Sequence, residues 1–404
     1  MSAPSRLHEL IARYGSLLGC LIEKGPMTRG QLGAALGVAQ PTITRRTMEL
    51  IESNILCEGE VASEESRLGR PSRLLDIVPD AAYVAALHLG RSDVELGLVN
   101  LKGEVVAKET MEGGPQEEEN PARFIDEAVE ALARLWAASG VPRERVLGLG
   151  VATTGVFDPA TGTDARFWLA DGRLVRTDVP VRQRLLRTVT LPTVIETNAW
   201  AMAMGDRWFG NRERDFALFH ANDGAAAAIV VNGSLYRGQG AAGEIAHNRV
   251  GDNRSPCSCG KRGCLAAVIS RSAIVAKVSR VHKVRTIWDV VALANQRDPD
   301  VLEVLAECAE AVGPACTSIV DLLDPKALVL SGPIFSVPLV FNAVEEYVRQ
   351  NSFTGRTGRV QVLRSPLGAD IALVGAASLV LDALLKGEGR NGAAEGRVPI
   401  ARSS

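Results

Sequence analysis

The chain has 404 residues and a formal net charge of −2, so it is long enough for two or three domains. It carries no overall positive charge that would attract nucleic acid, and any DNA-binding surface must therefore be local. No uninterrupted apolar stretch approaches the roughly 18 to 20 residues needed to span a bilayer, and no apolar signal-peptide core opens the chain. We expect a soluble, cytoplasmic protein without a membrane partner.

Residues 1–80 are expected to form a small helical domain. Apolar residues at helical spacing predict one amphipathic helix over Arg6–Glu23. Thr28 and Gln31 form a capping-box pattern that opens a second helix, and Pro41 fits the first turn of a third. Two short helices joined by a tight turn predict a helix-turn-helix. The outward-facing DNA-contacting residues of the third helix are predicted to be Gln40, Thr42, Thr44, Arg45 and Arg46.

Two strand-like runs, 55–58 and 73–78, follow with a polar tip between them. A hairpin in this place is the wing of a winged helix-turn-helix, and Arg67 and Arg70 at its tip are predicted to enter a narrow minor groove. Residues 1–80 hold nine Lys and Arg against ten Asp and Glu, so the domain is not basic overall. Three-helix modules also serve for dimerisation or peptide docking, and that alternative stays open.

Residues 81–385 contain two series of strands followed by helices. Strands are expected near 84–90, 94–100 and 104–110, then a helix over 121–138 and strands at 146–152 and 193–195. A second series begins with strands near 216–219, 225–231 and 234–236, with a hairpin turn at Asn232-Gly233 between the last two. It continues with helices near 271–281, 286–296 and 299–323. This repeat predicts two α/β lobes, 81–200 and 201–385, with a cleft between them. Residues 386–404 lack apolar periodicity, and we expect a disordered tail.

Three of the seven cysteines fall within eight residues, at Cys257, Cys259 and Cys264, close after His247. Three thiolates and one imidazole are the ligand set of a closed, tetrahedral structural zinc site. Gly260 and Gly263 suit a tight turn that lets the thiolates converge. The alternatives are chance clustering and a disulfide.

The predicted winged domain, the two lobes, the run Ala-Gly-Glu-Ile-Ala-His at 242–247 and the cysteine motif at 257–265 together resemble the ROK family of repressors and sugar kinases. The resemblance covers essentially the whole chain and is greatest to the family's xylose, N-acetylglucosamine and glucose-type regulators. It implies a sugar-kinase/actin-like (RNase H-like) fold and a structural Zn²⁺. It also implies a homodimer or tetramer that binds a double-stranded DNA operator and responds to a carbohydrate effector.

The phosphate-binding and catalytic motifs of the family's kinases are altered here. The first glycine-rich phosphate loop reads His88-Leu89-Gly90, and the second is replaced by residues 221–226, so Cβ atoms occupy places where backbone must approach phosphate. The general base of the kinases is replaced by Asn198, whose amide cannot accept a proton at neutral pH. Three such changes together predict that the chain is not an enzyme.

The sugar pocket implied by the resemblance is partly retained. Gly155, Asn198, Glu244 and His247 are predicted to bind the effector, while Thr197 and Ala266 stand where the family has an Asn and a Glu. The usual hexose should therefore bind weakly or differently, because an unmatched buried polar group costs about 1–3 kcal/mol. Glu244 could instead form a salt bridge that supports the zinc loop.

The leading hypothesis is a carbohydrate-responsive transcriptional regulator, most often a repressor in this family. Two alternatives stay open. A residual sugar kinase would turn over ATP with hexoses, and a ligand-independent regulator would answer to a protein partner that docks near the zinc loop.

Overall fold

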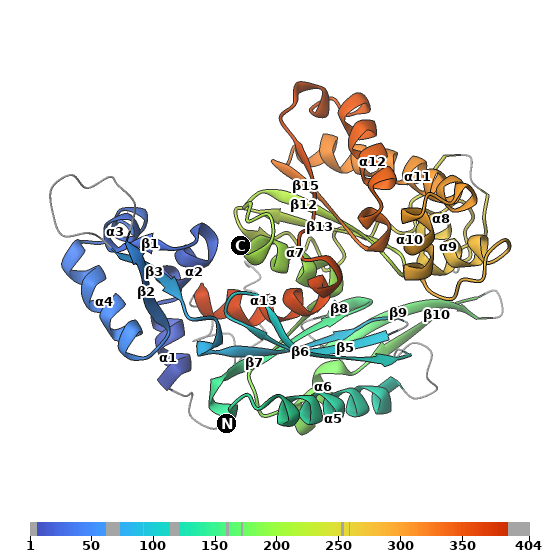
Figure 1. Cartoon of the computed structure of the whole chain (residues 1–404). Coiled ribbons are helices and arrows are strands. Elements are labelled where there is room, and N and C mark those ends of the chain that lie inside the picture. Colours follow the sequence, from blue (N-terminus) through green and yellow to red (C-terminus); the bar gives the residue numbers. More distant parts are fainter. Residues whose placement is uncertain are drawn as a thin grey trace, which may run out of the picture.

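The computed structural model describes residues 6–61, 73–91, 93–113, 121–158, 161–170, 173–251, 254–257 and 259–386. A helical N-terminal segment lies beside two α/β lobes, each built on a five-stranded sheet (Figure 1). The predicted arrangement of two lobes is confirmed.

The described residues of the N-terminal segment, 6–61 and 73–77, form four helices and a three-stranded sheet of order β1-β3-β2. Thr28 caps the second predicted helix with the expected capping box, and Gly37 ends this helix in the left-handed conformation. In chain order the elements are α1 (Arg6–Arg13), α2 (Gly15–Lys24), β1 (Met27–Thr28), α3 (Arg29–Leu36), α4 (Gln40–Glu52), β2 (Leu56–Val61) and β3 (Arg73–Ile77).

The prediction of one continuous helix over Arg6–Glu23 is wrong, because the chain breaks at Tyr14 between α1 and α2. The break lies at a tertiary contact. A Cβ at Gly15 would lie 2.5 Å from the carbonyl oxygen of Leu385, so the backbones nearly touch there. The Tyr14 hydroxyl donates to Glu49 on α4, which holds the break in place.

The first lobe is a sheet of order β11-β7-β4-β5-β6, in which β4 pairs in parallel with β7 and antiparallel with β5. Its elements are β4 (Tyr83–Leu89), β5 (Asp93–Asn100), β6 (Val105–Glu112), α5 (Pro121–Ser139), β7 (Val146–Thr153), α6 (Val181–Thr188) and β11 (Thr193–Thr197). The strands β4 and β7 are buried along their whole length, as their continuous apolar sequences require.

The second lobe repeats this topology, with a sheet of order β14-β13-β12-β15-β16. When the strands are numbered in chain order within each five-stranded sheet, both sheets have the order 3-2-1-4-5, which is strong support for two related halves. The strands are β12 (Phe216–Ala221), β13 (Ala225–Val231), β14 (Ser234–Leu235), β15 (Ala327–Ser331) and β16 (Gln361–Arg364). The turn predicted at Asn232-Gly233 is present, with both residues at positive φ.

Helices cover the second lobe, and those predicted near 271–281, 286–296 and 299–323 are confirmed. The helices are α8 (Ala266–Ile269), α9 (Arg271–Val278), α10 (Ile287–Asn295), α11 (Pro299–Leu323) and α12 (Pro338–Asn351). Short 3-10 turns lie at η1 (Pro79–Ala81), η2 (Arg143–Arg145), η3 (Pro333–Ser336), η4 (Gly355–Thr357) and η5 (Gly368–Asp370). Sequence reasoning did not find α12, nor a separate antiparallel sheet of β8 (Val156–Asp158), β9 (Thr163–Ala170) and β10 (Arg173–Val179).

Two helices, α7 (Asn198–Phe209) and α13 (Ile371–Leu385), lie between the two large sheets (Figure 1). They cross with their backbones almost in contact, since a Cβ at Gly375 would lie 2.6 Å from the carbonyl oxygen of Ala201. Residues 368–385 are long and apolar enough to cross a membrane, but 72% of that window is buried inside the protein. In this structure α13 is a core helix, in a cluster shared with α1, α2, β4 and β7.

Candidate metal centre and interlobe cleft

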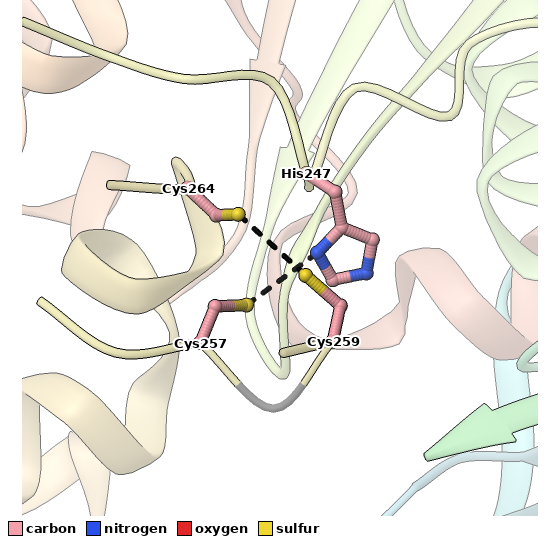
Figure 2. Close-up of side chains that lie close together, drawn as sticks. All are labelled: His247, Cys257, Cys259 and Cys264. Carbon is pink, nitrogen blue, oxygen red and sulfur yellow. Dashed lines mark hydrogen bonds between the residues drawn. The ribbon is translucent and has the colours of Figure 1, made fainter. Parts of the chain in front are cut away.

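The predicted zinc ligands come together in one cluster, which we call the metal cluster: His247, Cys257, Cys259 and Cys264 (Figure 2). The chain between Pro256 and Arg262 turns back on itself through a β-bridge between those two residues. Gly260 and Gly263 have φ of 84° and 77°, which a residue with a side chain rarely adopts. The two glycines therefore permit the turn that points the thiols inward.

The distances in the metal cluster match a tetrahedral zinc site. His247 Nδ1 lies 3.5 Å from Cys257 Sγ, and Cys259 Sγ lies 3.7 Å from Cys264 Sγ. Zinc bonds of about 2.3 Å to sulfur and about 2.0–2.1 Å to nitrogen would give tetrahedral edges of about 3.5–3.8 Å. All four ligand atoms lie within 4.8 Å of one another. The predicted disulfide alternative is not formed, because all seven cysteines are free.

The thiols of the metal cluster differ in their ease of ionisation. Burial and the neighbouring thiols of Cys259 and Cys257 raise the pKa of the Cys264 thiol to about 12. Burial also opposes ionisation of Cys259, but hydrogen bonds from the Lys261 backbone and the neighbouring thiols lower its pKa overall. The protein alone thus resists gathering several thiolates here, and a divalent cation would supply the missing positive charge. The donor set and its geometry fit zinc.

The predicted effector residues of the first lobe lie where β7 and β11 end side by side, as parallel neighbours. Asn198 Nδ2 donates to Thr154 Oγ1 at 3.3 Å, and its Oδ1 accepts from the Ala199 N–H at 2.7 Å. The carbonyl of Gly155, a residue with φ of 137°, accepts from the Thr197 hydroxyl at 3.5 Å. The carboxyl ends of parallel strands are a common place for ligands, and this one carries amide, hydroxyl and carbonyl groups.

The loop that carries Glu244 lies against the same junction. Arg237 places Nε and Nη2 each 2.8 Å from Glu196 Oε2, and its guanidinium lies 5.9 Å from the centre of the Trp200 ring. The Trp200 indole donates to the Ala242 carbonyl at 3.0 Å. These contacts join the second lobe to the start of α7, and sequence reasoning had missed Arg237 and Trp200.

Glu244 itself is exposed, yet desolvation by the surrounding protein raises the pKa of its carboxyl. The alternative prediction, a salt bridge that supports the zinc loop, finds no partner for Glu244 among the described residues. His247 belongs to the metal cluster. Burial, Lys261 and Arg91 lower the pKa of its imidazole, in that order, which favours the neutral, metal-binding form.

A separate pocket of about 360 Å³ lies between the lobes, lined by His88, Asp93, His220 and Arg271 among others. Arg271 Nη1 contacts Asp93 Oδ2 of the first lobe at 2.9 Å, and Nε pairs with Asp223 of the second. We call these three residues the ion-pair cluster. Asp93 and Asp223 stand close to the two segments that the family resemblance assigns to phosphate loops. Their carboxylates would repel a triphosphate. Sequence reasoning had missed this cluster, because its members come from three distant stretches.

The predicted DNA-contacting residues lie along α4. Gln40 and Arg45 are exposed, while Thr42, Thr44 and Arg46 are partly exposed. Neither Arg45 nor Arg46 forms an ion pair with another described residue. The opposite face of α4 is the buried one and is held by Ile43, Thr47 and Leu50. Arg67 and Arg70, predicted at the wing tip, lie outside the described residues.

Known proteins resemble this chain over nearly its full length. The xylose repressor of Bacillus subtilis (strain 168) is 23% identical over 373 residues, which cover 91% of this chain and 94% of the repressor. A crystal structure of a ROK family transcriptional regulator, a homologue of the E. coli MLC protein, aligns with a TM-score of 0.70 at 22% identity and covers 94% and 98% of the two chains.

A ROK family glucokinase from Streptomyces griseus, solved with glucose and AMPPNP, aligns with a TM-score of 0.62 at 23% identity. The alignment covers 74% of this chain and 99% of the kinase, so the kinase lacks a counterpart to about a quarter of this chain. The family model of the ROK family matches residues 84–383, which include both lobes and the metal cluster. The chain belongs to the ROK family.

Proposed function

We propose that the chain is a DNA-binding transcriptional regulator, and specifically a repressor of carbohydrate-related genes in the cytoplasm. In this proposal residues 1–80 form a winged helix-turn-helix with α4 as the recognition helix, and β2 and β3 form the wing. The observation that carries it is that Arg45 is exposed and Arg46 partly exposed, neither of them in an ion pair with another described residue, on a helix whose other face is buried. Unpaired arginines on such a helix suit phosphate and base-edge contacts.

The relatives support this interpretation, since both the Bacillus repressor and the solved regulator extend over the N-terminal segment. A homodimer or tetramer would present two α4 helices to a pseudo-palindromic operator. The cleft beside Asn198, Gly155, Glu244 and His247 would hold a sugar or sugar-derived effector, and a structural zinc in the metal cluster would fix the loop that carries two of them.

The proposal excludes sugar phosphorylation. Asn198 cannot act as a general base, and the carboxylates of Asp93 and Asp223 lie near both segments that would hold ATP phosphates. Purified, zinc-loaded protein is therefore expected to show no hexose-dependent ATP turnover on a broad sugar panel. Turnover that disappears on Asn198→Ala would overturn this part of the proposal.

The test of DNA binding is selection of high-affinity duplexes from a random library with the full chain, followed by affinity measurements over a range of salt concentrations. Replacing Arg45 and Arg46 with Ala should weaken binding about tenfold or more. The salt slope should fall by about 2, because each arginine that no longer neutralises a phosphate lowers it by about one unit. Arg280→Ala, at an exposed position of the second lobe, is the matched control and should bind like wild type.

Failure to select any duplex, or an Arg45/Arg46 double variant with unchanged affinity and salt slope, would contradict α4 as the recognition helix. The same protein titrated calorimetrically with D-xylose, D-glucose and N-acetylglucosamine tests the effector. The expected result is saturable binding of one sugar, which the Asn198→Ala substitution weakens. No detectable binding of any sugar in an extended panel would favour a regulator controlled by a protein partner.

A further inference from the structure

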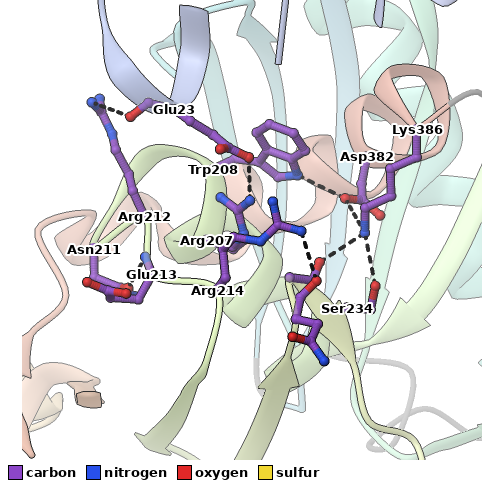
Figure 3. Close-up of polar contacts among 12 residues, drawn as sticks. Glu23, Arg207, Trp208, Asn211, Arg212, Glu213, Arg214, Ser234, Asp382 and Lys386 are labelled. Carbon is purple, nitrogen blue, oxygen red and sulfur yellow. Dashed lines mark hydrogen bonds and ion pairs between the residues drawn. The ribbon is translucent and has the colours of Figure 1, made fainter. Parts of the chain in front are cut away.

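Helix α7 runs from the junction of β7 and β11, where the proposed effector site lies, to the N-terminal segment. It begins at Asn198 and ends at Phe209, and twelve helical residues span about 18 Å. Its first turn carries the contacts of Asn198 and Trp200 described above. Its last turn carries Arg207 and Trp208, which contact α2 (Figure 3). The two ends of α7 thus contact the proposed effector site and the N-terminal segment.

The contact at the far end of α7 is a buried charge. Arg207 is only 3% exposed, and it pairs with Glu23 of α2 through Nη2. Its Nε and Nη1 atoms are buried and have no hydrogen-bond partner among the described residues. The negative charge that balances this cation therefore comes from the N-terminal segment. Removing it would leave a buried arginine uncompensated, which is strongly unfavourable.

Trp208 adds a second contact at the same end. Its indole donates to Asp382 of α13 at 3.1 Å, and its ring lies under Gly19 of α2, where a Cβ would be only 3.3 Å away. Arg212, just beyond α7, donates to the carbonyl of Glu23 at 3.5 Å. A shift of the end of α7 would therefore displace α2 or break these contacts.

The middle of α7 is held against α13. A Cβ at Gly205 would lie 2.9 Å from Gly375 Cα, so the two backbones touch and leave no space for side chains. A helix held at its centre can tilt about that point more easily than it can translate, because translation would drive neighbouring side chains into the contact. Movement of the first turn in the cleft would then be accompanied by opposite movement of the last turn.

We propose that α7 couples occupancy of the cleft to the orientation of the DNA-binding segment, and that the Arg207–Glu23 pair is the point of transmission. This inference rests on the proposed function. A ligand that changes the contacts of Asn198 tilts α7 about its crossing with α13, which displaces Arg207 relative to Glu23 and so repositions α2 and the helices attached to it.

The test is hydrogen–deuterium exchange of the full, zinc-loaded chain, read at the amides of residues 15–24 and 198–209. Asn198→Ala removes the hydrogen bonds at the cleft end. It should raise exchange in residues 15–24 by about threefold or more, although these residues do not touch position 198. In a Glu23→Gln background, the same substitution should add less than about 1.5-fold, because the point of transmission is already broken.

Asn351→Ala is the matched control, since it removes an asparagine hydrogen bond from α12 of the second lobe, and it should leave residues 15–24 unchanged. If the Asn198→Ala protein does not fold, the Asn198→Asp variant is used in the same experiment. Unchanged exchange in α2 with Asn198→Ala, or independent effects of the two substitutions, would overturn the coupling. The experiment uses neither DNA nor sugar, so its failure is separate from failure of the proposed function.

Discussion

The metal cluster and the ion-pair cluster are built differently. The ligands of the metal cluster lie between residues 247 and 264, on loops of a single lobe. The ion-pair cluster takes Asp93 from the first lobe and Asp223 and Arg271 from two separate stretches of the second. The metal cluster gathers donors that need an added cation. In the ion-pair cluster, Arg271 already supplies a positive charge, which balances one of the two carboxylate charges.

This difference indicates two separate roles. Because the metal cluster lies within one lobe, zinc can fix the shape of a loop without fixing the distance between lobes. The ion-pair cluster, in contrast, spans the cleft where related kinases would need space for nucleotide phosphates. The loop should therefore depend on metal, and the spacing of the lobes should depend on charge. The following substitutions separate the two dependences.

The largest effect is expected at the metal cluster. Replacing Cys257 and Cys264 with Ser should release zinc and lower the free energy of unfolding by on the order of 5 kcal/mol, because metal binding contributes directly to folding. Zinc content by mass spectrometry and denaturant unfolding measure this. Cys57→Ser, at an exposed cysteine outside the cluster, is the control and should change neither. A double variant that keeps wild-type stability would show that zinc has no structural role.

A smaller effect concerns pH and the pocket beside the ion-pair cluster. Burial, assisted by His88, lowers the pKa of His220 to about 4 from an ordinary value of 6.5. Between these values the unfolded chain binds a proton at this residue and the folded chain does not, so stability falls as pH falls from 6.5 to 4. The loss should total about 3 kcal/mol. His220→Asn should flatten the pH dependence in this window, and a parallel curve for the variant would contradict the assignment.

The smallest of the three effects is expected at the ion-pair cluster. Arg271→Met leaves Asp93 and Asp223 without their shared cation and should cost about 1–2 kcal/mol, since the three side chains are 18–31% exposed and partly screened by water. Zinc content should stay normal. Lys277→Met, which removes an exposed ion pair from the same helix, should cost less than about 0.5 kcal/mol. Loss of zinc from the Arg271→Met variant would contradict this separation, because it would show that the metal cluster depends on the ion-pair cluster.

Local patterns in the sequence predicted much of the fold. The capping box at Thr28, the turn at Asn232-Gly233 and the cysteine motif each depend on residues a few positions apart, and each is present as expected. Where a distant segment decides the conformation, the sequence was a poorer guide. The break at Tyr14 lies at a contact between Gly15 and Leu385, which no local periodicity can indicate.

The same distinction applies to the candidate site. The family resemblance pointed to Asn198 and Glu244, but not to the Arg237–Glu196 pair that joins their elements, nor to Arg271. These are ordinary charged residues in sequence. Their importance comes from the partners that the two related sheets bring to them across the cleft.

The measurement that tests the account most directly is operator affinity with and without sugar. A selected duplex, titrated by fluorescence anisotropy in the presence of each member of a sugar panel, should be bound at least about tenfold more weakly with one sugar, which is a coupling of about 1.4 kcal/mol. Asn198→Ala should bind the duplex but lose that response. Operator affinity that is the same with every sugar, in protein that demonstrably binds one of them, would contradict a carbohydrate-responsive regulator.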